Sequence, residues 1–324
     1  MMLTVFHLDQ GLLCQDVASA DWHEIPAETV WIDLMSPTRE EERQVENWTE
    51  IEVPTREEMQ EIELSSRLYV EGRATVMTMP VINKASSEAP ESAAITFILV
   101  KGLMITVRYV DPVPFSMFVR RINRNPAMAA SGEQALMGLL EQIADRLADI
   151  LEGATADLEA LSRQVFLTAD DRPHGSRDLR RILQKIGRAG DLATRAKDSL
   201  LGLNRLLLFL SVQSSFKKEA RGRIKMLMRD ANSIAEHANF LSGKVSFLLD
   251  ATLGLINIEQ NNIIKIFSVA AVAFLPPTLI ASIYGMNFRV MPELDWQFGY
   301  LWALGLMLLA AIVPLWYFRR RKWL

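Results

Sequence analysis

The chain has 324 residues, of which 50% are hydrophobic and 23% are charged, and its formal net charge is −4. One cysteine excludes an intrachain disulfide framework, and four scattered histidines leave little material for a Cys/His zinc site. Net acidity without a basic stripe argues against nucleic acid as the main partner.

Residues 1–130 have the pattern of a cytoplasmic α/β domain. Segments rich in β-branched and aromatic residues alternate with segments that carry helix start signals. This alternation predicts a mixed sheet with helices on both faces. No glycine-rich phosphate loop follows any strand, so a nucleotide is not an expected partner. We expect strands at 3–8, 29–34, 68–82, 94–100 and 103–110, and helices at 38–51 and 56–65.

Residues 131–260 predict a stalk of long helices, with breaks at 170–177 and 214–218. The last helix is expected to run without interruption from Arg221 to Tyr284, a length of about 95 Å at 1.5 Å per residue. One of its faces carries apolar residues in heptad alternation, which predicts packing on another helix. This seam comprises Leu227, Ala231, Ile234, Ala238, Leu241, Val245, Leu248, Thr252 and Leu255.

Residues 261–324 predict a transmembrane pore domain. Two uncharged runs, 266–283 and 300–318, come close to the ~20 residues that cross a bilayer, which predicts spans at about 263–284 and 300–318. Six cationic and two anionic side chains follow residue 260, so this tail carries +4 and residues 1–260 carry −8. Cations after the second span predict that both termini are cytoplasmic.

The cations of this tail also predict a basic collar at the cytoplasmic interface, although topology and contact with lipid headgroups explain them equally well. The predicted collar comprises Lys265, Arg319, Arg320, Arg321 and Lys322.

A second face of the last helix is small or polar at most positions. Packing between helices would explain such a stripe, and so would a water-filled pore lined by symmetric copies. Asn261 and Asn262 at the membrane entrance favour the pore. Two spans per chain cannot enclose a pore, so a pore requires a homo-oligomer with this helix innermost. The predicted pore-lining residues are Asn257, Asn261, Ile264, Ser268, Ala271, Leu275, Thr278 and Ser282.

The first span ends in Tyr284-Gly285-Met286-Asn287. At the outer end of the first of two C-terminal spans, this motif resembles the signature of the CorA family of divalent-cation channels. Met291-Pro292-Glu293-Leu294 follows in the outer loop, as in magnesium-transporting members. The resemblance is best over residues 240–324, and the N-terminal part agrees in layout more than in motifs.

The resemblance implies a homopentameric funnel in the lipid bilayer of a bacterial inner membrane. It implies inward transport of Mg²⁺, and possible acceptance of Co²⁺ and Ni²⁺, driven by the membrane potential without a nucleotide. Mg²⁺ would be both the transported and the regulatory ion, with no further cofactor. An enzyme is not expected, because no nucleophile–base pair or metal-ligand cluster stands out.

Gly285, Met286 and Asn287 are the expected selectivity filter. Mg²⁺ dehydrates reluctantly, and a ring of neutral oxygens can accept hydrogen bonds from the hydrated ion without stripping its shell. Thr278 and Asn261 are expected to form further polar rings that contact the metal. No cysteine or histidine lies within residues 238–324, which favours a hard, oxygen-preferring cation.

Ile264 and Leu275 are the expected hydrophobic constrictions, which can gate a pore by dewetting. Glu293 and Asp295 would raise the cation concentration at the outer mouth, and a solvated loop is an equal alternative for them.

Closure by cytoplasmic Mg²⁺ is a hypothesis drawn from the acidic body of the chain. Its charges repel one another between subunits, and Mg²⁺ that bridges carboxylates would relieve this repulsion. Asp230 and Asp250 on the long helix are the candidate metal ligands, with Glu88 and Glu91 as weaker partners. A solvated surface is the competing explanation for each of the four.

Two other functions stay open. A zinc transporter of the same superfamily, with or without proton coupling, is disfavoured by the Met-Pro-Glu-Leu loop and by the lack of soft ligands near the pore. A membrane-anchored coiled-coil scaffold would explain the heptads but not the polar stripe or the Gly-Met-Asn motif.

Overall fold

The computed structural model describes residues 2–19, 21–61, 63–167, 176–213, 218–287, 291 and 296–321. The chain forms two compact units, a first unit of Met1–Phe166 with Leu183–Leu248 and a second unit of Leu167–Ile182 with Leu249–Leu324. The domain limits predicted at residues 130 and 260 separate the α/β part, the long helices and the membrane spans, which is a different division from these compact units. These limits stay a prediction.

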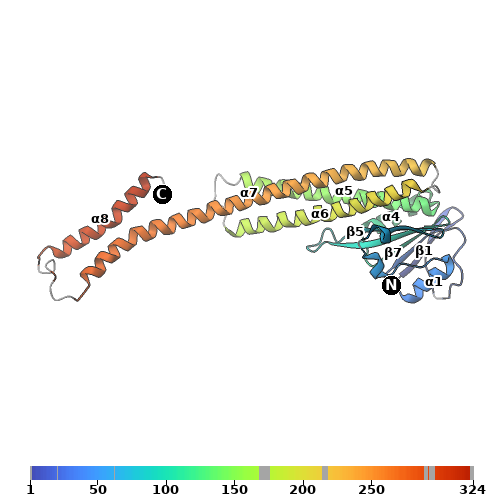
Figure 1. Cartoon of the computed structure of the whole chain (residues 1–324), viewed down its shortest axis with the longest axis horizontal. Coiled ribbons are helices and arrows are strands. Elements are labelled where there is room, and N and C mark those ends of the chain that lie inside the picture. Colours follow the sequence, from blue (N-terminus) through green and yellow to red (C-terminus); the bar gives the residue numbers. More distant parts are fainter. Residues whose placement is uncertain are drawn as a thin grey trace. The chain divides into compact units, whose positions relative to one another are not determined.

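A seven-stranded sheet forms the base of the first unit (Figure 1). β3 and β7 pair in parallel, with Trp31 opposite Met104, and the other described neighbours pair antiparallel. The sheet is therefore mixed, as predicted. Its strands are β1 (Met2–Asp9), β2 (Leu12–Val17), β3 (Thr29–Met35), β4 (Leu68–Glu71), β5 (Ala74–Asn83), β6 (Glu91–Val100) and β7 (Leu103–Arg108), in the order β2-β1-β3-β7-β6-β5-β4.

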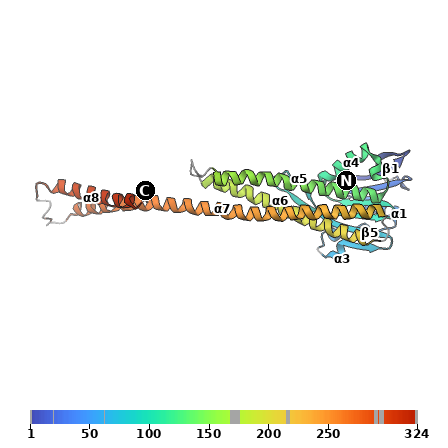
Figure 2. The same cartoon turned by 90° about the horizontal axis from the view of Figure 1, so that it is seen from above.

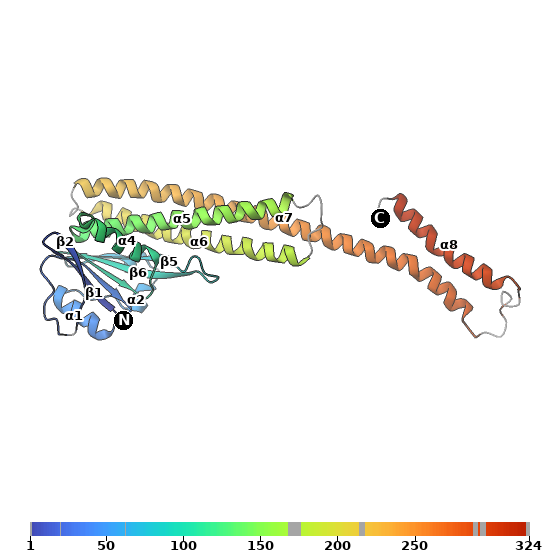
Figure 3. The ribbon, with the colours of Figure 1, turned by 180° about the vertical axis from the view of Figure 1, so that it is seen from behind.

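Short helices cover one face of the sheet: α1 (Arg39–Thr49), α2 (Arg56–Met59) and α3 (Leu64–Arg67) (Figure 3). Alternate strand residues such as Val5 and Ile32 point to this face and share a core with Val45 of α1 and Met59 of α2. Helix α1 begins where predicted, because Thr38 and Glu41 form a reciprocal capping box.

Longer helices cover the opposite face: α4 (Val113–Arg124), α5 (Gly132–Leu167) and α6 (Ser176–Val212). Trp31 of β3 stacks on Phe6 at a centroid distance of 4.3 Å and contacts Phe118 of α4. Gly138 lets α5 approach this core, since a Cβ there would lie 2.6 Å from the Phe118 ring. Helices on both faces confirm the predicted α/β architecture.

A buried ion pair joins the end of β7 to the centre of the sheet. Arg108 donates to both carboxylate oxygens of Asp33, at 3.0 Å and 2.8 Å, and to Asp111 at 2.7 Å. Thr106 adds a 2.7 Å hydrogen bond to the same Asp33 carboxylate. Burial alone would lower the pKa of Arg108, but the bonds and charge of Asp33, together with Asp111, raise it above its usual value.

Helices α5, α6 and α7 (Lys218–Tyr284) lie side by side in the first unit (Figures 1 and 2). The predicted seam is buried from Leu227 to Leu248, with Ile234 half-buried. Arg223 and Glu141 form a 2.8 Å ion pair between α7 and α5. Helix α7 has no interruption between Lys218 and Tyr284, as predicted. The predicted breaks at 170–177 and 214–218 fall largely outside the described residues.

Some local elements differ from the prediction. The expected strand 68–82 is a hairpin of β4 and β5, because Gly72 adopts a left-handed turn with φ +56°. The expected helix 56–65 is divided into α2 and α3, and the like charges of Glu57 and Glu61, four residues apart, disfavour one continuous helix. Strand β2 and helix α4 were not predicted.

Candidate ion-conduction site

Two helices of the chain are long and apolar enough to cross a membrane, by length and composition: Glu219–Tyr284 in α7 and Gly299–Arg320 in α8 (Gly299–Arg320). A core helix of a soluble protein can pass the same test, but such a helix is mostly buried. Here only 11% and 6% of the apolar windows are buried. The exposure of both windows therefore fits contact with lipid or with other copies of the chain.

Helix α8 returns beside the end of α7 as a helical hairpin (Figure 1). Val269 and Ala273 of α7 are 6% and 9% exposed, and Ala303 of α8 is 7% exposed. These buried aliphatic residues mark the sides on which the two helices pack. Small residues at such a contact allow helices to approach closely in a membrane.

The predicted pore-lining stripe lies on the other side of α7. An α-helix turns by about 100° per residue, which places Thr278 and Ser282 roughly opposite Val269 and Ala273. The predicted constrictions Ile264 and Leu275 are 61% and 66% exposed. All eight predicted pore-lining residues are exposed, from Asn257 to Ser282. The single chain thus leaves this stripe uncovered while it covers the opposite face with α8.

The predicted filter lies where α7 ends. Gly285 donates its N–H to the carbonyl of Ala281 at 3.0 Å, and Met286 donates to Ile283 at 3.2 Å, so the chain makes one more turn after Tyr284. A Cβ on Gly285 would lie 3.1 Å from the Ala281 oxygen, so a larger residue is crowded there. Asn287 is exposed, and its side chain has no hydrogen-bond partner in the described part of the chain.

The predicted basic collar is described only in part. Arg320 lies 5.2 Å from the Trp316 ring and Arg321 lies 5.7 Å from the Tyr317 ring. Lys265 precedes the end of α7 by about twenty residues, and Arg319 follows the start of α8 by about twenty, so each lies about 30 Å along its helix. That distance matches the hydrocarbon thickness of a bilayer. Lys322, Glu293 and Asp295 lie outside the described residues.

The candidate regulatory carboxylates are not brought together within one chain. Asp230 and Asp250 are both exposed and lie twenty residues apart on the same helix. Glu91 accepts from Asn83 at 2.8 Å and pairs with Lys84 at 3.1 Å, and these contacts lower its pKa. Among the described residues, no group of three or more acidic, histidine or cysteine side chains could hold a metal ion.

An acidic neighbourhood that the prediction missed surrounds Asp145 on α5. Burial raises the pKa of Asp145, and the negative charges of Glu141, Asp149 and Asp230 raise it further, against the lowering effect of Arg121. The spacing of Glu141, Asp145 and Asp149 at four-residue intervals on α5 was the available signal. The charge of Asp230 comes from α7, and its proximity to Asp145 depends on how the two helices pack.

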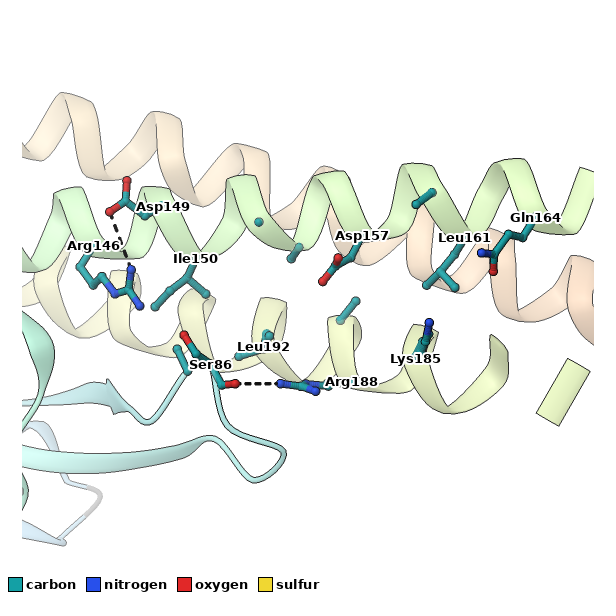
Figure 4. Close-up of a pocket in the computed structure, with 15 residues that line it drawn as sticks. Ser86, Arg146, Asp149, Ile150, Asp157, Leu161, Gln164, Lys185, Arg188 and Leu192 are labelled. Carbon is teal, nitrogen blue, oxygen red and sulfur yellow. Dashed lines mark hydrogen bonds and ion pairs between the residues drawn. The ribbon is translucent and has the colours of Figure 1, made fainter. Parts of the chain in front are cut away.

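A separate cavity of about 460 Å³ lies between α5 and α6 (Figure 4). Arg146 pairs with Asp149 at 3.9 Å, and Arg188 donates to the carbonyl of Ser86 at 3.3 Å. Asp157 and Lys185 add one charge of each sign. The cavity contains none of the predicted filter or stripe residues, so we do not assign it to ion conduction.

Comparisons with known proteins agree with this arrangement. A family model described as CorA-like Mg²⁺ transporter protein matches residues 26–320. The magnesium transport protein CorA of Pasteurella multocida is 34% identical over 295 residues, which cover 91% of this chain and 92% of that protein. The magnesium transport protein CorA of Yersinia pseudotuberculosis is 32% identical over 323 residues and covers 100% of both.

A solved structure supports the fold. The complete CorA magnesium transporter from Methanocaldococcus jannaschii matches with a TM-score of 0.74 at 19% identity, over 100% of this chain and 99% of that one. The chain therefore belongs to the family of CorA-like Mg²⁺ transporter proteins.

Proposed function

We propose that this chain assembles into a homo-oligomeric channel that conducts Mg²⁺ into the cell, with helix α7 innermost. The observation that carries the proposal is the exposed polar stripe of α7, which lies opposite the face covered by α8. The relatives named above are magnesium transport proteins that match nearly all of the chain. A dication gains about 4.6 kcal/mol on crossing 100 mV, at about 2.3 kcal/mol per charge, so no nucleotide is required.

We infer five copies around the pore from the resemblance to the CorA family. One hairpin of two helices cannot enclose water, so several copies of α7 must contribute to the wall. Each α8 would then face lipid outside its own α7. The apolar exposed surface of α8, which includes Leu308 and Ile312, suits such a position.

We infer that Gly285, Met286 and Asn287 select the ion as a ring of neutral oxygens. Mg²⁺ keeps its water shell because its dehydration is costly. Amide oxygens accept hydrogen bonds from this shell without the tight binding that a carboxylate ring would add. Thr278 and Asn261 would contact the hydrated ion deeper in the pore, and Co²⁺ and Ni²⁺ would share the path.

We infer that Ile264 and Leu275 form the narrow apolar part of the pore, where loss of water would stop conduction. Asp230 and Asp250 would bind cytoplasmic Mg²⁺ between neighbouring copies and favour the closed state. Each carboxylate needs ligands from another chain, since one chain supplies no complete site among its described residues. Loss of Mg²⁺-dependent closure in the double variant Asp230→Asn/Asp250→Asn tests this role.

We place the protein in a bacterial inner membrane with both termini in the cytoplasm. The cations that end α8 support this topology, because such residues are enriched on the cytoplasmic side. Lys265 and Arg319–Arg321 would form the collar at this interface, with Glu293 and Asp295 at the outer mouth.

Influx of divalent cations into liposomes that contain the purified protein tests the function. The inside is held negative, no pH gradient is applied, and Mg²⁺ is compared with Zn²⁺. We expect Mg²⁺ influx that Asn287→Ala abolishes. Influx of Zn²⁺ without Mg²⁺ would instead indicate a zinc transporter, and no flux of either ion would favour a scaffold.

A further inference from the structure

A groove on the first unit is lined with arginines and contains no acidic residue. It has a volume of about 530 Å³, within the range of small-molecule sites. The residues that line it include Met117, Arg120, Arg121 and Arg124 of α4, Met128 just after that helix, and Gln142 of α5. None of the predicted filter, stripe or collar residues lies in this groove.

The charge of the groove is opposite in sign to the net charge of residues 1–260. Residues 1–260 carry −8, whereas the three guanidinium groups give the groove +3. Arg120 and Arg124 lie one helical turn apart on α4, and neither has an ion-pair or hydrogen-bond partner among the described residues. Arg121 interacts with the charge of Asp145, which lies outside the groove lining.

Cations in the last turn of α4 interact favourably with the helix dipole, and this explains part of the clustering of arginines. It does not explain Gln142. This residue is only 6% exposed, lines the groove and has no hydrogen-bond partner in the part of the chain that the structure describes. Solvent in the groove reaches its amide atoms, since the described buried polar atoms that lack a partner belong to other residues. A ligand oxygen in the groove would accept its N–H hydrogens.

We propose that this groove binds a small anion that carries at least two phosphate groups. Guanidinium groups match phosphate oxygens with paired N–H donors. Adjacent phosphates of one ligand can bridge Arg120 and Arg124, whose Cβ atoms are about 5–6 Å apart at this spacing. Met117 and Met128 form an apolar edge for an organic part of the ligand. Inorganic oligophosphate and the phosphate chain of a nucleotide share this chemistry.

Titration calorimetry on the full chain in detergent tests the site, in metal-free buffer so that Mg²⁺ does not complex the phosphates. Inorganic triphosphate and ATP are the probes, with AMP and citrate for comparison. We expect sub-millimolar binding of triphosphate and ATP, and binding of AMP that is weaker by about tenfold or more. Tighter binding of ATP than of triphosphate would place its organic part on the methionines, and equal binding would assign recognition to the phosphates alone.

Three variants localise the binding. Arg120→Gln/Arg124→Gln should weaken triphosphate binding by about tenfold or more. Arg39→Gln/Arg43→Gln, an exposed pair at the same spacing on α1, removes the same charge and should leave binding unchanged. Gln142→Leu keeps a buried side chain of similar size and should weaken binding severalfold. The proposal is overturned if triphosphate does not bind at millimolar concentration, if citrate binds as tightly, or if both arginine pairs have the same effect.

Discussion

The hydroxyl group of Thr278 donates a 2.7 Å hydrogen bond to the carbonyl of Phe274, one helical turn earlier in α7. This bond uses the only hydrogen of the hydroxyl group, so its oxygen can only accept further hydrogen bonds. Thr278 is exposed on the stripe opposite α8. The water molecules around a hydrated cation point their hydrogens outward. An oxygen that only accepts hydrogen bonds is therefore suited to contact this water shell.

Replacement of Thr278 by valine removes this oxygen and keeps the shape of the side chain. We predict that Thr278→Val lowers Mg²⁺ influx into liposomes by about tenfold, the scale of one lost charge-assisted hydrogen bond. Thr278→Ser retains the oxygen and should conduct. Influx through the valine variant at the rate of the unchanged protein would remove Thr278 from the ion path.

Two alanines of α7 test the assignment of its faces. Ala271 belongs to the stripe and is exposed, whereas Ala273 is 9% exposed on the side packed with α8. We predict that Ala271→Phe blocks Mg²⁺ influx with little change in unfolding temperature, because the ring enters the pore. Ala273→Phe should instead lower the unfolding temperature, because overpacking of a close contact costs about 1–3 kcal/mol. A reversed pattern would mean that the faces are wrongly assigned.

The Asp33–Arg108 pair should be essential to the first unit. Both side chains are 6% exposed, so removal of one partner leaves a buried, uncompensated charge. We predict that Asp33→Leu lowers the free energy of unfolding by about 3–5 kcal/mol. Thermal unfolding followed by circular dichroism measures the change.

Two controls accompany this prediction. Asp111→Asn removes the other carboxylate that pairs with Arg108. The Asp111 side chain is 66% exposed, so this change should cost less than about 1 kcal/mol. Asp33→Leu/Arg108→Met replaces the pair by apolar groups and should recover much of the loss. Equal effects of Asp33→Leu and Asp111→Asn would contradict the account.

Because the pKa of Asp145 is raised, we predict that neutralising this side chain stabilises the fold, by an amount that depends on pH. A carboxyl group whose pKa is raised in the folded state opposes folding when it is ionised, and this opposition disappears as the pH falls through the folded pKa. We predict that Asp145→Asn raises the unfolding temperature at pH 7, by on the order of 1 °C, and that the gain vanishes in acid. An unfolding temperature at pH 7 that Asp145→Asn leaves unchanged would contradict this prediction.

The elements with strong sequence patterns were predicted, and those that depend on distant contacts were not. The α7 heptad seam repeats over many turns, and the two apolar spans are long, so both were visible in the sequence. The Asp33–Arg108 pair joins residues 75 positions apart, and neither residue carries a local signal. Helix α4 lacks a side-chain N-cap bond, since it begins after Pro112, and its start was missed.

Family membership confirms that the chain is a transporter and not an enzyme. It does not test the individual site residues. The structure of one chain places Gly285, Met286 and Asn287 at the end of α7, but the ring that they would form depends on other copies. The filter, the gate and the metal-sensing carboxylates therefore stay proposals.

Cysteine accessibility measures most directly whether the stripe of α7 faces a water-filled pore. In a Cys14→Ser background, which removes the only native cysteine, Ser282→Cys is compared with Ile280→Cys. The two positions lie at similar depth, and two residues turn the helix by about 200°, so they face opposite sides. We predict that a charged, water-soluble thiol reagent modifies Ser282→Cys and stops Mg²⁺ influx while it leaves Ile280→Cys conducting. Modification of Ile280→Cys with no effect at Ser282→Cys would contradict the proposed pore.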